Sequence, residues 1–198
     1  GAGRGAGGVA GGGAGGAAPP AGRGRGTLML KPKGAQSKGQ TPSDRRLFQE
    51  MPELQALDCG EVAKLSWPDT SVLTDMRVRI TPDKGYWRRA TFEFSIKITD
   101  DYPHQPPKVM CRTPIYHPNI DKDGNVCLNI LRGDWKPVLD TSAVIHGLIY
   151  LFDEPNGDDP LNHEAAEVLR NNEAQFRRNV DNSLSGGYVD GRRFPRLR

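Results

Sequence analysis

Cysteine is scarce in this chain of 198 residues, which contains only Cys59, Cys111 and Cys127. An odd number of cysteines without a Cys-x-x-Cys pair argues against a disulfide scaffold and against a zinc site. Free thiols are typical of the reducing cytoplasm and nucleus, where we expect the protein to act. No apolar run approaches the roughly 20 residues of a membrane-spanning helix, so the sequence predicts no membrane partner.

Acidic and aromatic side chains are both missing from residues 1–40. The six Arg and Lys residues there give a charge of +6, so the net charge of +3 leaves −3 on residues 41–198. Without aromatic residues to stack on bases, nucleic-acid binding is the weaker alternative; salt-sensitive binding that disappears without residues 1–26 would reveal it. Residues 1–26 are almost entirely Gly, Ala, Arg and Pro, a composition that cannot offset the entropy of ordering, and we expect them to be disordered.

Period-two alternation predicts strands in the first half of the remaining chain. Apolar residues alternate with polar ones over 76–80 and over 92–98, which indicates antiparallel strands with one buried face. Residues 81–85 have the composition of a turn between them. Residues 108–111, after a Pro-Pro break, are a shorter strand candidate.

Helical spacing predicts one helix before these strands and three after them. Residues 45–57 have helical periodicity, but a proline inside a helix removes a backbone hydrogen bond, so this helix is kinked at Pro52 or begins near it. Asp140 and Asn162 are candidate caps of the next two helices, and Gly186-Gly187 ends the last. Strands followed by helices indicate an α+β domain.

Cys127 lies in a segment, residues 113–140, that is rich in Pro and Gly and has little regular pattern. A long loop of this kind is usually functional. The tight turn predicted at 121–124 directly precedes the cysteine. By itself, a free cysteine is more often a small buried apolar residue than a nucleophile, and the motifs around Cys127 change that interpretation.

Those motifs are linked in order and spacing: Tyr116-His117-Pro118-Asn119, Cys127, Trp135-Lys136-Pro137 and Asp158-Asp159-Pro160-Leu161-Asn162. Over about residues 45–185 the chain resembles the ubiquitin-conjugating enzyme family. The resemblance implies a four-stranded antiparallel meander sheet with an N-terminal helix and C-terminal helices. It also implies a conjugating core with a C-terminal extension over residues 43–198, preceded by a flexible docking peptide and linker over residues 27–42.

Four peripheral runs resemble the Nedd/Rub-type enzymes more closely than the ubiquitin type: residues 102–109, 129–139, 164–169 and 186–195. The last run weighs most, because ubiquitin carriers usually stop before such an extension. Three alternatives stay open: a ubiquitin carrier with the same chemistry, a non-catalytic scaffold of the same fold, and a cysteine hydrolase. The hydrolase would pair Cys127 with His117, His146 or His163.

The resemblance also implies a role for each matching residue. Cys127 is the nucleophile that carries the modifier as a thioester and releases it to a substrate lysine. Asn119 holds the active-site loop or stabilises the oxyanion, and His117 is structural rather than a general base. Asp159 orients or desolvates the incoming lysine, or else is simply a capping or solvated acid. Tyr116 shapes the same groove.

By resemblance, the partners are a Nedd/Rub-type modifier, a heterodimeric activating enzyme, a RING ligase and a cullin substrate. Leu28, Met29 and Leu30 form a candidate docking peptide for the activating enzyme, although the aromatic residue usual in the family is missing. We expect no metal and no cofactor, since ATP is used upstream by the activating enzyme. Nothing in the chain resembles a phosphate-binding Gly loop.

Two loops carry the ligase-contact candidates implied by the resemblance: His104, Pro106, Trp135 and Pro137. For Trp135 and Pro137 there is also a plain alternative, in which they cover the end of the sheet and contact no partner.

Overall fold

The computed structural model describes residues 41–198. The candidate docking peptide at Leu28, Met29 and Leu30 and the leader over residues 1–26 lie outside the described residues, so these expectations remain predictions. The elements follow one another as α1 (Pro42–Cys59), β1 (Ala63–Ser66), β2 (Asp75–Ile80), β3 (Phe92–Lys97), β4 (Lys108–Cys111), the 3-10 helix η1 (Asn129–Leu131), α2 (Thr141–Asp153), α3 (His163–Asn171), α4 (Glu173–Leu184), β5 (Tyr188–Val189) and β6 (Arg192–Arg193).

The four longer strands form one antiparallel sheet in the order β1-β2-β3-β4. Val78 on β2 lies opposite Leu65 on β1 and Phe94 on β3, and Phe94 lies opposite Cys111 on β4. Directly opposed residues share a face, and all four are buried. The predicted α+β class and meander sheet are therefore confirmed, although β1 was too short for its alternation to be recognised in the sequence.

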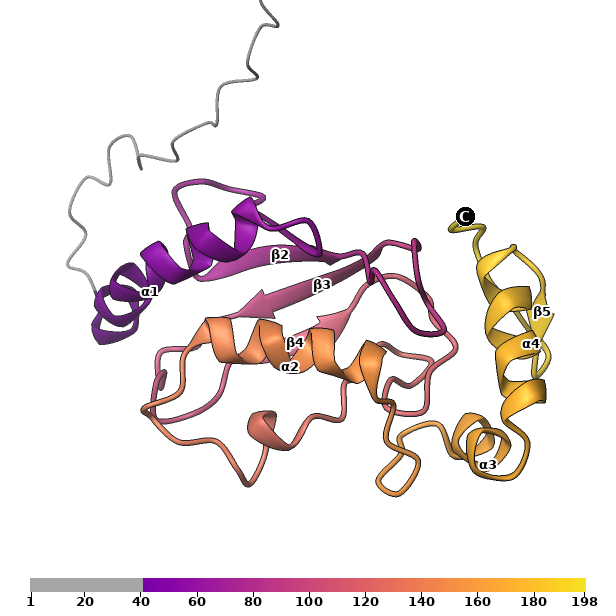
Figure 1. Cartoon of the computed structure of the whole chain (residues 1–198). Coiled ribbons are helices and arrows are strands. Elements are labelled where there is room, and N and C mark those ends of the chain that lie inside the picture. The colour runs from indigo at the N-terminus through magenta and orange to yellow at the C-terminus, as the bar shows by residue number, and fades with distance from the viewer. Residues whose placement is uncertain (1–40) are drawn as a thin grey trace, which may run out of the picture. The chain divides into compact units, whose positions relative to one another are not determined.

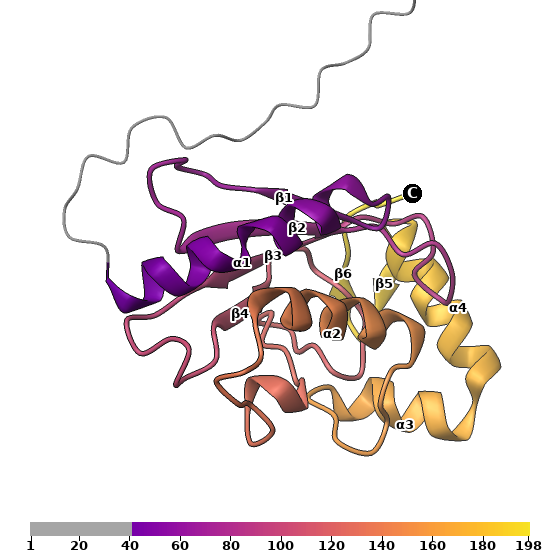
Figure 2. The same cartoon turned by 60° about the vertical axis from the view of Figure 1, so that its left-hand side comes forward.

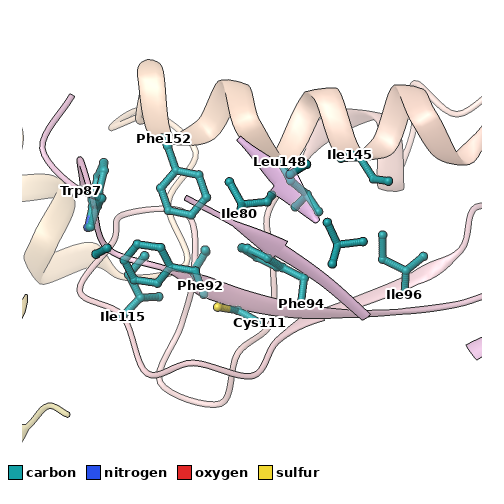
Figure 3. Close-up of a cluster of buried hydrophobic side chains, with 14 of the residues drawn as sticks. Ile80, Trp87, Phe92, Phe94, Ile96, Cys111, Ile115, Ile145, Leu148 and Phe152 are labelled. Carbon is teal, nitrogen blue, oxygen red and sulfur yellow. The ribbon is translucent and has the colours of Figure 1, made fainter. Parts of the chain in front are cut away.

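Helix α2 lies across the buried face of this sheet (Figure 3). Its apolar stripe includes Ile145, Leu148 and Phe152, all fully buried. Phe152 stacks on Phe92 with ring centroids 5.1 Å apart and meets Phe94 edge-on at 6.1 Å. Aromatic side chains contribute the largest buried areas of a core, so this cluster fixes the helix on the sheet. The predicted cap is also confirmed, because the Asp140 carboxylate accepts the Ala143 N–H.

Helix α1 begins at Pro42, well before Pro52, where the sequence had offered a possible start for this helix. Thr41 caps it through a reciprocal pair of hydrogen bonds with Asp44, and the helix then runs through Pro52 to its last residue. The prediction that the helix begins near Pro52 is wrong. Pro52 and Phe48, whose carbonyl loses its partner, both lie on the exposed side, where water can satisfy the carbonyl.

The C-terminal helices α3 and α4 lie beyond the end of the sheet (Figures 1 and 2). The Asn162 side chain caps α3, as predicted. After α4, the last residues return as the hairpin β5–β6, and Phe194 is buried with its N–H on the Gly187 carbonyl at 3.0 Å. No helix within residues 41–198 combines the length and apolar character needed to cross a membrane.

Candidate active site

Cys127 is positioned by a tightly folded hairpin. At its tip Gly124 has φ +90°, and its carbonyl accepts the Cys111 N–H at 2.8 Å. A Cβ on Gly124 would meet the Cys111 carbonyl oxygen at 2.1 Å, so only glycine fits here. The Asp121 carboxylate accepts the N–H groups of Asp123 and Asn125 at 2.8 and 2.9 Å. These bonds confirm the predicted tight turn and anchor the strand-like segment that carries the cysteine.

His117 is fully buried directly behind this hairpin. Its ring stacks on Trp87 with a centroid distance of 4.4 Å. Nδ1 accepts the Asn119 N–H at 2.9 Å, and therefore Nε2 carries the proton and donates to the Leu151 carbonyl at 3.0 Å. Burial lowers the pKa of His117 to about 4, so the ring is neutral near pH 7. Both nitrogens are engaged within the fold, and this geometry favours the structural role over proton transfer.

The Asn119 side chain joins the cysteine hairpin to the loop between α2 and α3. Its Nδ2 donates to the carbonyls of Asn156 and Asp159 at 2.8 and 3.3 Å, and its Oδ1 accepts the Asn156 N–H at 2.9 Å. On the hairpin side, the Asn119 carbonyl accepts the Cys127 N–H at 2.8 Å. Both amide protons are therefore used. Of the two roles implied by resemblance, the structure favours holding the active-site loop over donating to an oxyanion.

The Cys127 thiol lies beneath charged side chains. Its Sγ is 3.2 Å from the Asp159 carbonyl oxygen and 3.4 Å from Asp159 Oδ2. Arg132 Nη2 contacts both this sulfur and Asp159 Oδ2, forming an ion pair with the carboxylate at 2.7 Å. Burial and the neighbouring Asp159 raise the pKa of Cys127, while the Arg132 guanidinium opposes them. The structure thus brings Cys127, Asn119 and Asp159 together.

Sequence reasoning did not single out Arg132 as a site residue. Helix η1 follows Cys127, and the Arg132 N–H closes it by donating to the Asn129 carbonyl at 2.9 Å. This single turn returns the chain so that residue 132 faces residue 127. The sequence did hold one signal, because Arg132 is a cation five residues from the candidate nucleophile and positive charge favours a thiolate. The spacing of two residues in a loop, however, does not show that their side chains meet.

Tyr116 supports the site from behind. Its ring lies 5.6 Å from that of Phe176 on α4, and its hydroxyl accepts from Asn179 Nδ2 at 3.2 Å. Its carbonyl accepts the Trp87 indole N–H at 3.1 Å. The side chain is therefore directed to α4, where it lines a hollow of about 490 Å³ together with Phe194.

The ligase-contact candidates come from two loops that the structure places side by side. Trp135 Nε1 donates to the Pro103 carbonyl at 2.8 Å, and its ring lies 5.9 Å from that of Tyr102. His104 and Pro137 are exposed, whereas Trp135 and Pro106 are partly buried. The partial burial of Trp135 agrees with the packing alternative and leaves the neighbouring exposed residues available to a partner.

Among residues 41–198, no three His, Cys, Asp or Glu side chains gather as a metal site requires.

The site therefore consists of a cysteine on a tightly folded hairpin, held against a loop that the Asn119 side chain anchors. The family profile described as ubiquitin-conjugating enzyme matches residues 46–184, and the chain belongs to this family. Its members are transferases that carry their modifier as a cysteine thioester. The terminal residues 185–198 lie beyond that match.

The relatives that this chain matches include proteins named as NEDD8-conjugating enzymes, in line with the Nedd/Rub-type resemblance of its peripheral runs. An Arabidopsis thaliana protein named NEDD8-conjugating enzyme Ubc12 is 48% identical over 164 residues, covering 82% of this chain and 88% of that protein. The Drosophila melanogaster Nedd8-conjugating enzyme UbcE2M is 45% identical over 157 residues, covering 79% and 85%. The solved structure of S. cerevisiae Ubc12 matches with a TM-score of 0.73 at 36% identity, covering 80% and 85%. The predicted family resemblance and fold are confirmed.

Proposed function

We propose that this protein is a NEDD8-conjugating enzyme that accepts NEDD8 as a thioester on Cys127 and transfers it to substrate lysines. The relatives named NEDD8-conjugating enzyme, 48% and 45% identical to this chain, carry the choice of modifier. The setting of the Cys127 thiol supports the choice of nucleophile, because Arg132 and Asp159 meet at the sulfur and their side chains remain half exposed. The other cysteines are less suited. Burial raises the pKa of Cys111 to about 12, and Cys59 ends α1 outside this hairpin.

The reaction consists of two acyl transfers. In the first, the Cys127 thiolate attacks the carbonyl carbon of the thioester on the activating enzyme; a new C–S bond forms, the old one breaks, and the departing thiolate takes up a proton. In the second, a neutral lysine amine attacks the same carbon; an amide bond forms, the amine loses a proton, and Cys127 leaves as a thiolate. No oxidant or cofactor is consumed, and ATP is used upstream.

In this proposal, Asp159 assists the second transfer. Its Oδ2 lies 3.4 Å from the Cys127 sulfur, so an amine hydrogen-bonded to this carboxylate is within reach of a carbonyl carbon on Sγ. Holding two reactants in this way lowers the entropic part of the barrier. Asn119 contributes by fixing the loop on which Asp159 lies.

The partners we propose are the heterodimeric activating enzyme, a RING ligase and a cullin, encountered in the cytoplasm and nucleus. Helix α1 and the loops of His104 and Trp135 form one continuous candidate surface for these partners, since Arg46 Nη2 donates to the Leu139 carbonyl at 3.2 Å and Trp135 bonds Pro103. Exposed Phe48 and Val138 supply apolar area there. Exposed apolar side chains of this kind suit a protein partner.

A loading assay on a non-reducing gel tests the proposal. The chain is mixed with ATP, NEDD8 and its activating enzyme, and in parallel with ubiquitin and its own activating enzyme. We expect a reductant-sensitive adduct with NEDD8, retained in Cys59→Ser and lost in Cys127→Ala. Loading by ubiquitin alone would support the thioester chemistry but contradict NEDD8 as the modifier. An adduct that survives Cys127→Ala would contradict Cys127 as the residue that carries the modifier.

The docking peptide is tested in the same assay. Leu28→Ala combined with Leu30→Ala should slow NEDD8 loading severalfold, because an apolar anchor on the activating enzyme is lost. The matched control is Gln36→Ala combined with Ser37→Ala, polar changes in the neighbouring segment. Equal loading rates in both double variants would exclude Leu28 and Leu30 as anchors.

A further inference from the structure

The cysteine thiol of this protein is covered, although it must react with two large partners. Cys127 is only 5% exposed. On one side its sulfur meets the backbone carbonyl and the carboxylate of Asp159, and on the other side Arg132 Nη2. An acyl carbon bonded to this sulfur needs space that these groups occupy, so at least one of them moves before loading.

The groups over the sulfur differ in how firmly they are held. The Asp159 carbonyl is fixed by the Asn119 amide, which also holds Asn156 from two sides. The Arg132 and Asp159 side chains are instead 50% and 59% exposed and are joined by a single ion pair of 2.7 Å. Exposed ion pairs are weak, and water replaces them readily. The side chain of Arg132 is therefore the part of the cover that can open without disturbing the loop.

We propose that Arg132 is a gate over the Cys127 thiol, held closed by its ion pair with Asp159, and that loading displaces it and frees the Asp159 carboxylate for the acceptor lysine. The closing of the thiol in the unloaded protein follows from the contacts alone. The release of Asp159 on loading rests on the proposed function.

The same ion pair couples access to the thiol with its ionisation. The guanidinium favours the thiolate, whereas burial and the Asp159 carboxylate raise the pKa of Cys127. Removing Arg132 therefore uncovers the sulfur and at the same time makes its thiolate less stable. These two effects are separable, because one changes the reaction rate of the thiolate and the other changes the pH at which the thiolate forms.

The test is the rate of Cys127 alkylation by iodoacetamide as a function of pH, in the unloaded full chain with Cys59→Ser. In Arg132→Ala we expect the plateau rate at high pH to rise about two- to fivefold, the increase that corresponds to losing an ion pair worth about 0.4–1 kcal/mol. The midpoint should move to higher pH. In Asp159→Asn the plateau should rise similarly, and the midpoint should move to lower pH.

The double variant shows whether the two residues act as one gate. If they do, Arg132→Ala with Asp159→Asn reaches no higher plateau than either single variant; plateaus that multiply, or that stay at the level of the unmodified chain, overturn the proposal. Arg170→Ala is the matched control, since Arg170 bonds the Gly157 carbonyl of the same loop and should leave both plateau and midpoint unchanged. A rise in this control would assign the effect to loop packing and not to the gate.

A second arm uses the loaded enzyme. With NEDD8 on Cys127, single-turnover discharge to free lysine should slow severalfold in Asp159→Asn and should slow clearly less in Arg132→Ala, where the carboxylate is still present. Equal slowing in both would overturn the release of Asp159. The alkylation result is independent of any modifier, so failure of loading would count against the proposed function and leave the gate standing.

Discussion

The buried imidazole of His117 and the covered thiol of Cys127 both have pKa values shifted toward their neutral forms, because burial penalises charge in each. For His117 no opposite charge compensates, and two hydrogen bonds hold the neutral ring. At Cys127, the positive charge of Arg132 partly offsets the rise in pKa that burial causes. The thiol of Cys127 and the imidazole of His117 therefore have their pKa values set by different surroundings, and the histidine serves the site through its hydrogen bonds.

The state of His117 predicts how stability depends on pH. Its folded pKa of about 4 lies below the unfolded value of 6.5, so its stabilising contribution is complete above pH 6.5 and is lost as the pH falls toward 4. Between pH 7.5 and pH 5 the loss is roughly 2 kcal/mol. Urea unfolding at the two pH values should show this loss in the unchanged chain and in His146→Gln, a surface control, and a smaller loss in His117→Gln. Equal losses in all three would contradict the assignment.

Two residues have backbone properties that matter for the elements in which they lie, Pro52 in helix α1 and Gly124 in the hairpin that precedes Cys127. Pro52 interrupts the backbone hydrogen bonding of α1, while Leu47 and Leu54 on the opposite side remain fully buried. Gly124 gives the cysteine hairpin its sharp turn beside the Cys111 backbone. The first is a tolerated cost on the exposed side of a helix, and the second is a requirement of the turn.

Replacing the proline should strengthen α1. Pro52→Ala restores a backbone donor within the helix and, after the greater freedom of the unfolded chain is subtracted, should stabilise the protein by about 1–3 kcal/mol. Gln49→Ala, at another exposed position of the same helix, should change little. Chemical denaturation measures both; a destabilised Pro52→Ala would mean that the proline is required by its surroundings.

Replacing the glycine should have the opposite effect. Gly124→Ala combines φ +90° with a Cβ 2.1 Å from the Cys111 carbonyl oxygen, and should cost at least about 3 kcal/mol and slow loading. Gly133→Ala is the matched control on the far side of Cys127, because a Cβ there meets nothing within 4 Å. Comparable stability of the two variants in thermal unfolding would show that the hairpin relaxes at no cost.

Across the whole described domain, the C-terminal helices support the active-site loop from behind. Phe176 of α4 lies 5.6 Å from Tyr116 and 6.0 Å from Trp87, and Trp87 stacks on His117. The terminal hairpin β5–β6 then packs back on this end, with Phe194 buried and the Leu197 N–H on the Leu184 carbonyl at 2.9 Å. A continuous row of aromatic contacts therefore connects α4 to the loop that precedes Cys127.

This connection predicts that the extension contributes to stability. Phe194→Ala removes a buried aromatic side chain and should destabilise the protein by about 3 kcal/mol. Tyr188→Ala, an aromatic residue of the same hairpin that is 64% exposed, should change stability by less than about 0.5 kcal/mol. Thermal unfolding compares them, and similar values would show that the hairpin is attached only loosely.

The sequence by itself determined the class of fold and pointed to Cys127 as the candidate nucleophile, because local patterns indicate the first and motif spacing indicates the second. Alternation over 76–80 and 92–98, the helix caps Asp140 and Asn162, and the spacing from His117 to Cys127 are short-range features that physics or family resemblance can interpret. The alternation within β1 was too short to recognise. Pro52 also led to a wrong expectation for the start of α1. Whether a helix continues through a proline depends on whether the proline lies on the side of the helix that faces water.

Only the tertiary structure decided what surrounds the thiol. Asn119 reaches Asn156 and Asp159 across 37 and 40 residues of chain, and Arg132 meets Asp159 across 27. These pairs lie on irregular loops, where spacing in the sequence gives no direction to a side chain. The cover on Cys127 and the neutral state of His117 arise from burial among groups distant in sequence, and burial exists only once the chain has folded.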